Sequence, residues 1–158
     1  MTHHLEEIEA IKRLKYKYLR CVDSKLWDEL TECFIPDATT SFSSGEYSYQ
    51  GVDAIINFLR EGLNPNMLSM HHGHHPEIEL TSETTATGTW ALEDYVIMTD
   101  LNMSLHGAAF YHDEYVKVNG EWKIKSTGYD RVFEEIWNRG DIPSLKVTKS
   151  MHALPNPE

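Results

Sequence analysis

Residues 107–124, GAAFYHDEYVKVNGEWKI, are the stretch that decides the fold. Apolar and polar side chains alternate along both halves of this stretch, as they do in β-strands that bury one face. Asn119-Gly120 separates the halves, and this dipeptide readily takes the positive φ angles of a two-residue hairpin turn. The stretch therefore predicts two antiparallel strands joined by a tight turn.

Outward from this hairpin, the same alternation covers most of the second half of the chain. It predicts four long strands, at residues 67–80, 85–99, 103–118 and 121–133. In the first half, the apolar residues recur with the period of a helix instead. We expect helices at 5–22, 26–34 and 52–62, and short strands at 39–42 and 47–49. Helices followed by an antiparallel meander indicate the α+β class, and a curved sheet around a long helix leaves one open mouth for a ligand.

Size and composition favour one domain. The chain has 158 residues, of which 41% are hydrophobic, so we assign residues 1–158 to a single domain with 136–158 as an irregular C-terminal arm. The net charge of −11 disfavours nucleic acid and membrane surfaces as partners. No apolar run spans a bilayer, the N-terminus does not look like a signal peptide, and Cys21 and Cys33 suit reduced core thiols, so we expect a cytoplasmic protein.

Asp94 is a carboxylate on an apolar strand face. Alternation places it on the same face as Trp90, Leu92, Val96 and Met98. It is either a structural carboxylate bonded to a neighbour or an acid inside a pocket. We favour the pocket, because the residues on either side of Asp94 already supply the polar face of the strand.

The run HHGHH at residues 71–75 is rich in histidine. Neighbouring side chains of a strand point to opposite faces, so at most two imidazoles converge, and no cysteine pair accompanies them; we therefore expect no metal site. A general base is the better interpretation. Alternation from Ile78 points His72 and His74 inward, so His71 reaches a pocket only if a bulge at Gly73 re-aims it.

Asp23 and Tyr18 lie at the end of the first predicted helix. Alone, Asp23 would be interpreted as a helix-terminal carboxylate or as the N-cap of the next helix. If a histidine such as His71 reaches Asp23, the two side chains form a general base. Their pairing also removes the free-energy cost of burying either group without a partner.

Arg131 is out of phase with the inward-facing residues Trp122 and Ile124. It lies on the surface unless a bulge near Gly128 turns it inward. Aromatic residues are expected to form the wall of the pocket and to bind the substrate, and they are Tyr49, Phe110 and Tyr129.

Five segments of the chain together resemble a known family. They are EAIKRLKYKYLRCVDSKLWDEL, SMHHGHHPEIEL, ATGTWALEDYVIMTD, GAAFYHDEYVKVNGEWKI and TGYDRVFEE. The chain resembles the SnoaL-like group of the nuclear-transport-factor-2-like superfamily, and within it most closely the bacterial bile-acid 7-alpha-dehydratases. It resembles scytalone dehydratase and hexachlorocyclohexane dehydrochlorinase more distantly. The resemblance covers nearly the whole chain and implies a cone-shaped, curved antiparallel sheet packed on three N-terminal helices.

The resemblance also implies a reaction, the elimination of water from a hydroxylated steroid or bile-acid-like enone by a His–Asp dyad. No cofactor is needed. The imidazole takes a proton, the tyrosine stabilises the oxyanion, and the second aspartate or the imidazolium protonates the departing hydroxyl. The arginine anchors the substrate or pairs with that aspartate. Carried over by motif, the catalytic residues are Tyr18, Asp23, His71, Asp94 and Arg131.

The implied partner is a hydrophobic polycyclic small molecule, free or conjugated to coenzyme A. A homo-trimer that packs through the outer face of the sheet is expected, with a dimer as the alternative. Two other functions fit the same cone: an isomerase or polyketide cyclase that moves a proton without expelling water, and a non-catalytic ligand-binding domain. A separation of Asp23 and His71 too long for a hydrogen bond would favour the last.

Overall fold

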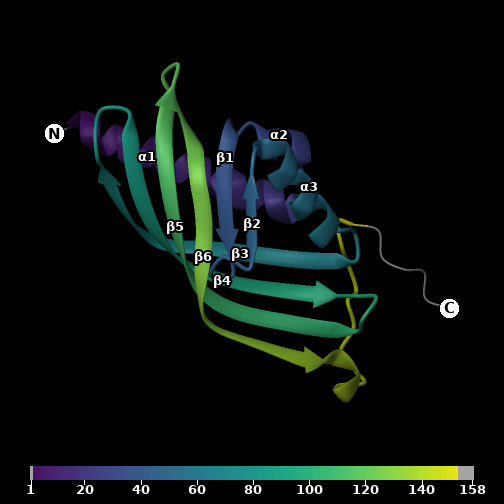
Figure 1. The fold of residues 1–158 in the computed structure, drawn as a ribbon. Helices are drawn as coiled ribbons and strands as arrows, with labels where there is room; N and C mark the ends of the chain where they lie inside the picture. Colours follow the sequence, from purple (N-terminus) through teal and green to yellow (C-terminus); the bar gives the residue numbers. More distant parts are fainter. Residues whose placement is uncertain (1, 153–158) are drawn as a thin grey trace.

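The computed structural model describes residues 2–152, which contain α-helices, one long mixed sheet and a short 3-10 helix. In chain order the elements are α1 (Thr2–Ser24), α2 (Trp27–Thr31), β1 (Phe34–Phe42), β2 (Tyr47–Gln50), α3 (Val52–Gly62), β3 (Met67–Leu80), β4 (Thr85–Met98), β5 (Met103–Val118), β6 (Glu121–Asn138) and η1 (Arg139–Asp141). The strands form a strongly bent sheet with the three helices on one side of it (Figure 1). The predicted α+β class is confirmed.

The strand order of the six-stranded sheet is β2-β1-β6-β5-β4-β3. Strands that are neighbours in this order pair antiparallel except β1 and β6, which pair parallel, so the predicted antiparallel sheet is in fact mixed. Hairpin signals report only on strands that follow one another in the chain. β1 and β6 are far apart in the chain, so no tight turn forces them to run antiparallel, and they can pair in the parallel direction.

The second predicted helix, at 26–34, is shorter in the structure. α2 ends at Thr31, and Phe34 already begins β1. The backbone N–H of Ile124 donates a hydrogen bond to the carbonyl oxygen of Cys33 at 2.8 Å. Pairing with β6 therefore draws this segment into the sheet, which local helical periodicity could not indicate.

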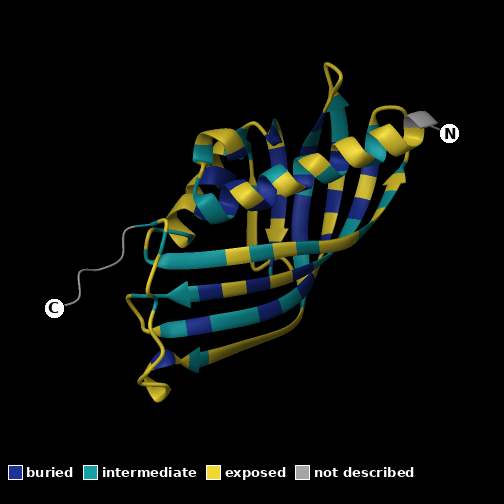
Figure 2. Cartoon of the chain, turned by 180° about the vertical axis from the view of Figure 1, so that it is seen from behind, coloured by how far each residue is buried: buried dark blue, intermediate teal, exposed yellow. Residues whose placement is uncertain are grey.

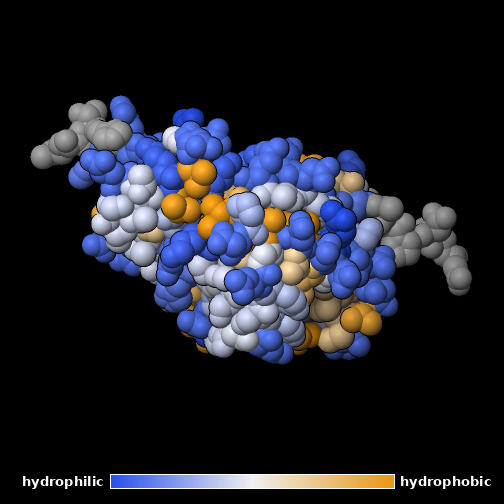
Figure 3. All heavy atoms as spheres, turned by 45° about the horizontal axis from the view of Figure 1, so that its top comes forward, coloured by the Kyte–Doolittle hydropathy of each residue, from blue (hydrophilic) through white to orange (hydrophobic). Residues whose placement is uncertain are grey.

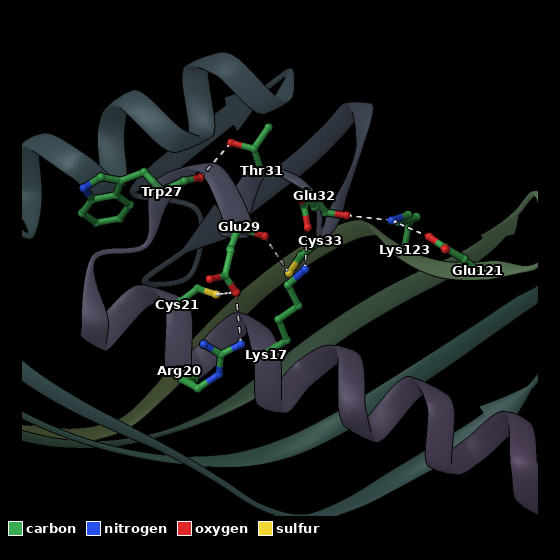
Figure 4. Close-up of polar contacts among 10 residues, drawn as sticks. All are labelled: Lys17, Arg20, Cys21, Trp27, Glu29, Thr31, Glu32, Cys33, Glu121 and Lys123. Carbon is green, nitrogen blue, oxygen red and sulfur yellow. Dashed lines mark hydrogen bonds and ion pairs between the residues drawn. The ribbon is translucent and has the colours of Figure 1, made fainter.

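Two ion pairs connect the end of α1 with Glu29 of α2 and with Glu32, the residue that follows α2 (Figure 4). Nζ of Lys17 lies 2.7 Å from Oε2 of Glu32, and Nη2 of Arg20 lies 3.2 Å from Oε2 of Glu29. These exposed contacts lie beside the tight turn that follows the last residues of α1, including Asp23.

The core lies between α1, α3 and the face of the sheet that α1 crosses (Figure 2). Cys21 and Cys33 are free and buried, as predicted. Burial raises the pKa of the Cys33 thiol to about 11, so it stays protonated. The face shown in Figure 3 is mostly hydrophilic, in keeping with the charge of the chain. No helix among residues 2–152 combines the length and hydrophobicity needed to cross a membrane.

The bulge in β3 is not at Gly73 as predicted. Gly73 pairs regularly with Leu92, and the register shifts between His74 and Glu77 instead. A side chain at Gly73 would lie 2.9 Å from Leu19 of α1, so this glycine permits the close approach of the helix. The displaced bulge still has the predicted consequence, because it lets His71 share a face with Ile78.

β6 runs five residues beyond the predicted end at 133, and its bulges also differ from the prediction. Glu114 pairs with Ser126 and Tyr115 with Ile124, which leaves Lys125 as the extra residue in place of Gly128. The insertion reverses the inward phase of the strand as far as Arg131, after which a second extra residue, Val132, restores the original phase.

The arm predicted for residues 136–158 begins only after η1, because its first residues extend β6. From there the chain runs along the ends of the strands toward α3 (Figure 1). His152 reaches back to the end of α1, where its Nε2 lies 3.0 Å from the carbonyl oxygen of Asp23. The predicted residues 153–158 lie outside the described part of the chain.

Candidate active site

Asp23 and His71 form a hydrogen-bonded dyad. Oδ1 of Asp23 lies 2.6 Å from Nδ1 of His71, and the two side chains are 11% and 14% exposed. Oδ2 accepts from the backbone N–H of His71 at 2.8 Å, and the hydroxyl of Ser69 donates to Oδ1 at 2.8 Å. Three contacts from β3 therefore fix this carboxylate, which α1 carries near its C-terminal end.

The dyad sets the tautomer of the imidazole. A carboxylate only accepts hydrogen bonds, so Nδ1 of His71 carries a proton and Nε2 is the basic nitrogen. Within residues 2–152, Nε2 has no hydrogen-bond partner, and His71 lines the main cavity. The arrangement presents a proton acceptor to whatever occupies that cavity.

The cavity has a volume of about 760 Å³, within the range of small-molecule sites. Helices α1 and α3 and the inward face of the sheet form its wall. That wall is mainly apolar and aromatic, with contributions from Val22, Phe42, Phe58, Leu63, Val96 and Leu105. Polar side chains also line the cavity, namely Ser43, Ser44, Glu46, His71, Asp94, Arg131 and Glu134, so a ligand here would combine burial of apolar surface with polar contacts.

Asp94 and Arg131 meet on the same wall as a bidentate ion pair. Nη1 and Nη2 of Arg131 lie 2.5 and 2.9 Å from Oδ1 and Oδ2 of Asp94. Partial burial opposes the charge of the guanidinium, but the hydrogen bonds and the charge of Asp94 outweigh this and raise the pKa of Arg131 above its ordinary value. Of the two roles expected for Asp94, pairing with Arg131 is the one that this geometry favours over proton donation.

Asp94 also faces the dyad. It is directly opposite His71 in the β3–β4 register. Facing side chains of neighbouring strands lie close together on one side of the sheet, so the dyad and the ion pair share one polar corner of the cavity.

Tyr18 lies in α1 and lines the cavity. Its side chain is 2% exposed, and its ring packs edge-on against Tyr111. Burial raises the pKa of Tyr18 well above its ordinary value, although a hydrogen bond with Tyr111 acts in the opposite direction. Tyr18 therefore keeps its hydroxyl proton, which it can donate to a developing oxyanion.

Of the three aromatic residues expected in the pocket wall, only Tyr129 lines the cavity. Tyr49 lies behind the wall, with its ring stacked on Phe58 at 4.5 Å between centroids. Phe110 is 46% exposed on the outer face, so its assignment to the pocket is wrong. The reason is alternation, because its neighbour Tyr111 is the residue that points inward.

A second buried ion pair, absent from the sequence predictions, supports this wall. Nζ of Lys15 lies 2.7 Å from Oδ2 of Asp113, and both side chains are fully buried. The hydroxyls of Tyr115 and Thr127 each donate to Asp113 at 2.6 Å. Nζ of Lys15 also lies 3.5 Å from the ring centre of Tyr111, a wall residue. One sequence signal could have revealed the buried lysine. Lys15 follows Ile11 by four residues and precedes Tyr18 by three, which places a lysine on the apolar stripe of α1.

Burial is the largest influence on Lys15 and lowers its pKa, while the charge of Asp113 and a hydrogen bond to it act in the opposite direction. The pair places a cation directly behind the aromatic wall formed by Tyr18 and Tyr111.

Gly107 makes room for the Asp94–Arg131 pair. It is opposite Asp94 on β5, and an added Cβ would overlap the guanidinium of Arg131 and lie 2.7 Å from Oδ1 of Asp94. Gly107→Ala should therefore separate the pair and displace Arg131 by about 1 Å, which is enough to lower turnover by roughly a hundredfold. Crystal structures and kinetics of this variant and of Ala108→Ser, on the other face of β5, provide the check. An intact pair in Gly107→Ala would contradict the packing argument.

Comparisons with known proteins agree with this architecture. The profile of the SnoaL-like domain matches residues 3–128. A protein of Gibberella zeae named as a probable cyclase is 23% identical over 140 residues, which cover 81% of this chain and 93% of the relative.

Two solved structures are close in shape. A protein of Novosphingobium aromaticivorans, provisionally named a scytalone dehydratase, has a TM-score of 0.79 and 27% identity, with 85% of this chain and 91% of that chain covered. A type 2 hexachlorocyclohexane dehydrochlorinase has a TM-score of 0.78 and 21% identity, with 97% and 96% covered. The second likeness shows the fold alone.

Proposed function

The chain belongs to the SnoaL-like domain family, and from that premise we propose that it is a cofactor-independent carbon–oxygen lyase. The proposed substrate class is a hydroxylated polycyclic enone of the steroid or bile-acid type, which is the class that the resemblance noted in the sequence implies. The observation that carries the proposal is the Asp23–His71 dyad, joined at 2.6 Å, at the wall of a largely apolar cavity.

In the proposed reaction, Nε2 of His71 removes a proton from the carbon that is conjugated with the carbonyl through the enone and lies beside the carbon bearing the hydroxyl. Asp23 holds the ring and balances the charge of the imidazolium that forms. The negative charge passes to the carbonyl oxygen, where the hydroxyl of Tyr18 stabilises it with a hydrogen bond.

The second half of the reaction expels the hydroxyl. The carbanion electrons form the new double bond, the carbon–oxygen bond breaks, and the imidazolium of His71 returns its proton to the departing oxygen as water. Arg131 is held by Asp94 and lies 3.3 Å from Oε2 of Glu134 through its Nε, and in the proposal it binds an oxygen-rich or acidic part of the substrate. The enone of the substrate spreads the negative charge itself, so each step uses only residues of this chain.

The name of one structural neighbour supports an elimination. The Novosphingobium aromaticivorans protein is provisionally named a scytalone dehydratase, and a dehydratase removes water from its substrate. Fold alone does not set the substrate, so the proposed substrate class rests on the sequence resemblance.

A panel of hydroxylated steroid enones, free and as coenzyme A thioesters, tests the proposal. We expect one member to lose one water, with an absorbance change from the extended conjugation and a matching decrease in product mass. No loss of water from any member, at enzyme concentrations that show ligand binding, would contradict the steroid assignment.

An isomerase or cyclase is the second candidate, and the cyclase name of the Gibberella zeae relative favours it. Such an enzyme would use the same dyad to move a proton, and the product would have the mass of the substrate. The third candidate is a non-catalytic binding domain. A long separation of Asp23 and His71 would have favoured it, but the two side chains are 2.6 Å apart. Assembly as a homo-trimer, with a dimer as the alternative, is part of the proposal, and light scattering tests it.

A further inference from the structure

A group of histidine and glutamate side chains lies on the outer face of the sheet, behind the candidate active site. His71 points into the cavity, so its neighbours His72 and His74 point outward. Glu93 is directly opposite His72 on β4. His72, His74 and Glu93 are exposed, and one potential ligand atom from each lies within 4.8 Å of the other two.

The geometry points to a site for a divalent transition metal of the zinc type, formed by His72, His74 and Glu93. Two imidazoles two positions apart on a strand, with a third ligand from the next strand, leave a fourth tetrahedral position open for water. Ligand atoms in such a site are roughly 3.4 Å apart for metal bonds of about 2.0–2.1 Å. Nε2 of His74 and Oε2 of Glu93 are 3.7 Å apart, so small side-chain rotations would bring them into range.

His106 and Glu135 orient the carboxylate ligand. Nε2 of His106 lies 3.1 Å from Oε1 of Glu93, and its Nδ1 lies 3.1 Å from Oε1 of Glu135. This row of contacts holds one oxygen of Glu93 and turns the other toward His74. Outer partners of this kind commonly orient metal ligands.

The donor set selects the metal. Imidazole nitrogens with one carboxylate suit zinc, copper and nickel, whereas magnesium and calcium prefer oxygen ligands throughout. Two converging imidazoles alone were too few to predict a site from the sequence. Glu93 becomes the third ligand only through the register of β3 and β4.

Bound metal would join β3, the edge strand, to β4 directly behind the polar corner of the cavity. His71 and Asp94 are the residues next to the proposed ligands in the two strands. The site would thus stabilise the register that places these two side chains. The proposed elimination has no step that uses this metal, so the two proposals stand separately.

Calorimetric titration of the untagged, chelator-treated chain with Zn²⁺ tests the inference. We expect one zinc per chain, a higher melting temperature when zinc is present, and no response to Mg²⁺. Co²⁺ should give the visible absorption of a tetrahedral site. His74→Ala removes one of three protein ligands and should weaken zinc binding by about 30-fold or more. Glu93→Gln should weaken it as well.

His112→Ala is the matched control. His112 is another exposed histidine of the outer face, paired with Asp130 at 3.5 Å and outside the proposed ligand set. This variant and His71→Ala should both bind zinc as the unaltered chain does. The inference is overturned if zinc does not bind saturably, if His112→Ala loses as much affinity as His74→Ala, if His71→Ala abolishes binding, or if zinc binds only by joining two chains.

Discussion

Replacement of His71 by asparagine should lower turnover of the matching hydroxy-enone by about a hundred- to ten-thousand-fold, the range of a lost general base. The asparagine amide can still donate a hydrogen bond to Asp23, so the carboxylate keeps a partner in its half-buried position. What the variant lacks is a basic nitrogen at the place of Nε2. The loss should appear in kcat while the melting temperature changes little, and steady-state kinetics and thermal unfolding measure the two.

His112→Asn is the matched control, since it makes the same substitution at an exposed histidine of the outer face that belongs to neither proposed site. It should keep turnover within about twofold, as exposed substitutions usually do. Asp23→Asn should also be severely impaired, because an amide in place of the carboxylate can favour the wrong tautomer of the imidazole. Turnover by His71→Asn above about a tenth of the unaltered level would rule out the proposed base.

Lys15→Met should lower the free energy of unfolding by about 3–5 kcal/mol, the usual effect of removing one partner of a buried ion pair. Lys15 and Asp113 are both fully buried at 2.7 Å from one another. Methionine fills much of the space but leaves the carboxylate of Asp113 without a counter-charge in the core. The hydroxyls of Tyr115 and Thr127 would then be its remaining described partners. Urea unfolding at neutral pH measures the loss.

Two further variants separate the charge from the packing. Lys17→Met breaks the ion pair with Glu32, which is largely exposed, and should change stability by less than about 1 kcal/mol. Lys15→Met combined with Asp113→Asn removes both charges and should be more stable than Lys15→Met alone. Equal stability of the Lys15→Met and Lys17→Met variants would contradict a structural role for the buried pair.

The hairpin and the long strands could be predicted because their signals are local. The turn residues Asn119 and Gly120 both take positive φ angles, 52° and 84°, as the dipeptide itself indicates. Alternation over long stretches likewise identifies a strand without reference to its partner. The parallel pairing of β1 with β6 had no such signal, because it depends on where two distant segments meet.

The orientation of the candidate site residues was harder to predict than their presence. One extra residue in a strand exchanges its two faces, and alternation cannot say where that residue falls. In β6 the extra residue is Lys125 and not Gly128, and this insertion turns Arg131 to the inward face of the sheet. For His71 the shift lies after His74, so a glycine is a poor guide to a bulge when it serves a packing contact instead.

Contacts between residues distant in the chain could not be predicted either, because local sequence patterns do not show which segments meet. Lys15 is recognisable as a lysine on an apolar stripe, but only the fold shows that Asp113 lies opposite it. Asp23 and His71 were brought together in the prediction by a family resemblance, and their spacing in the sequence alone left the N-cap interpretation of Asp23 open.

One carboxylate oxygen of Asp23 accepts the backbone N–H of His71, and β3 is the last strand of its sheet. Edge strands with free amide groups invite a strand from another molecule, and proteins usually block them with charges or coverings. Asp23 supplies such a block at the residue that bears the proposed base. Selection on this side chain would therefore act on solubility as well as on chemistry, and a lineage that lost the activity would still have a reason to keep it.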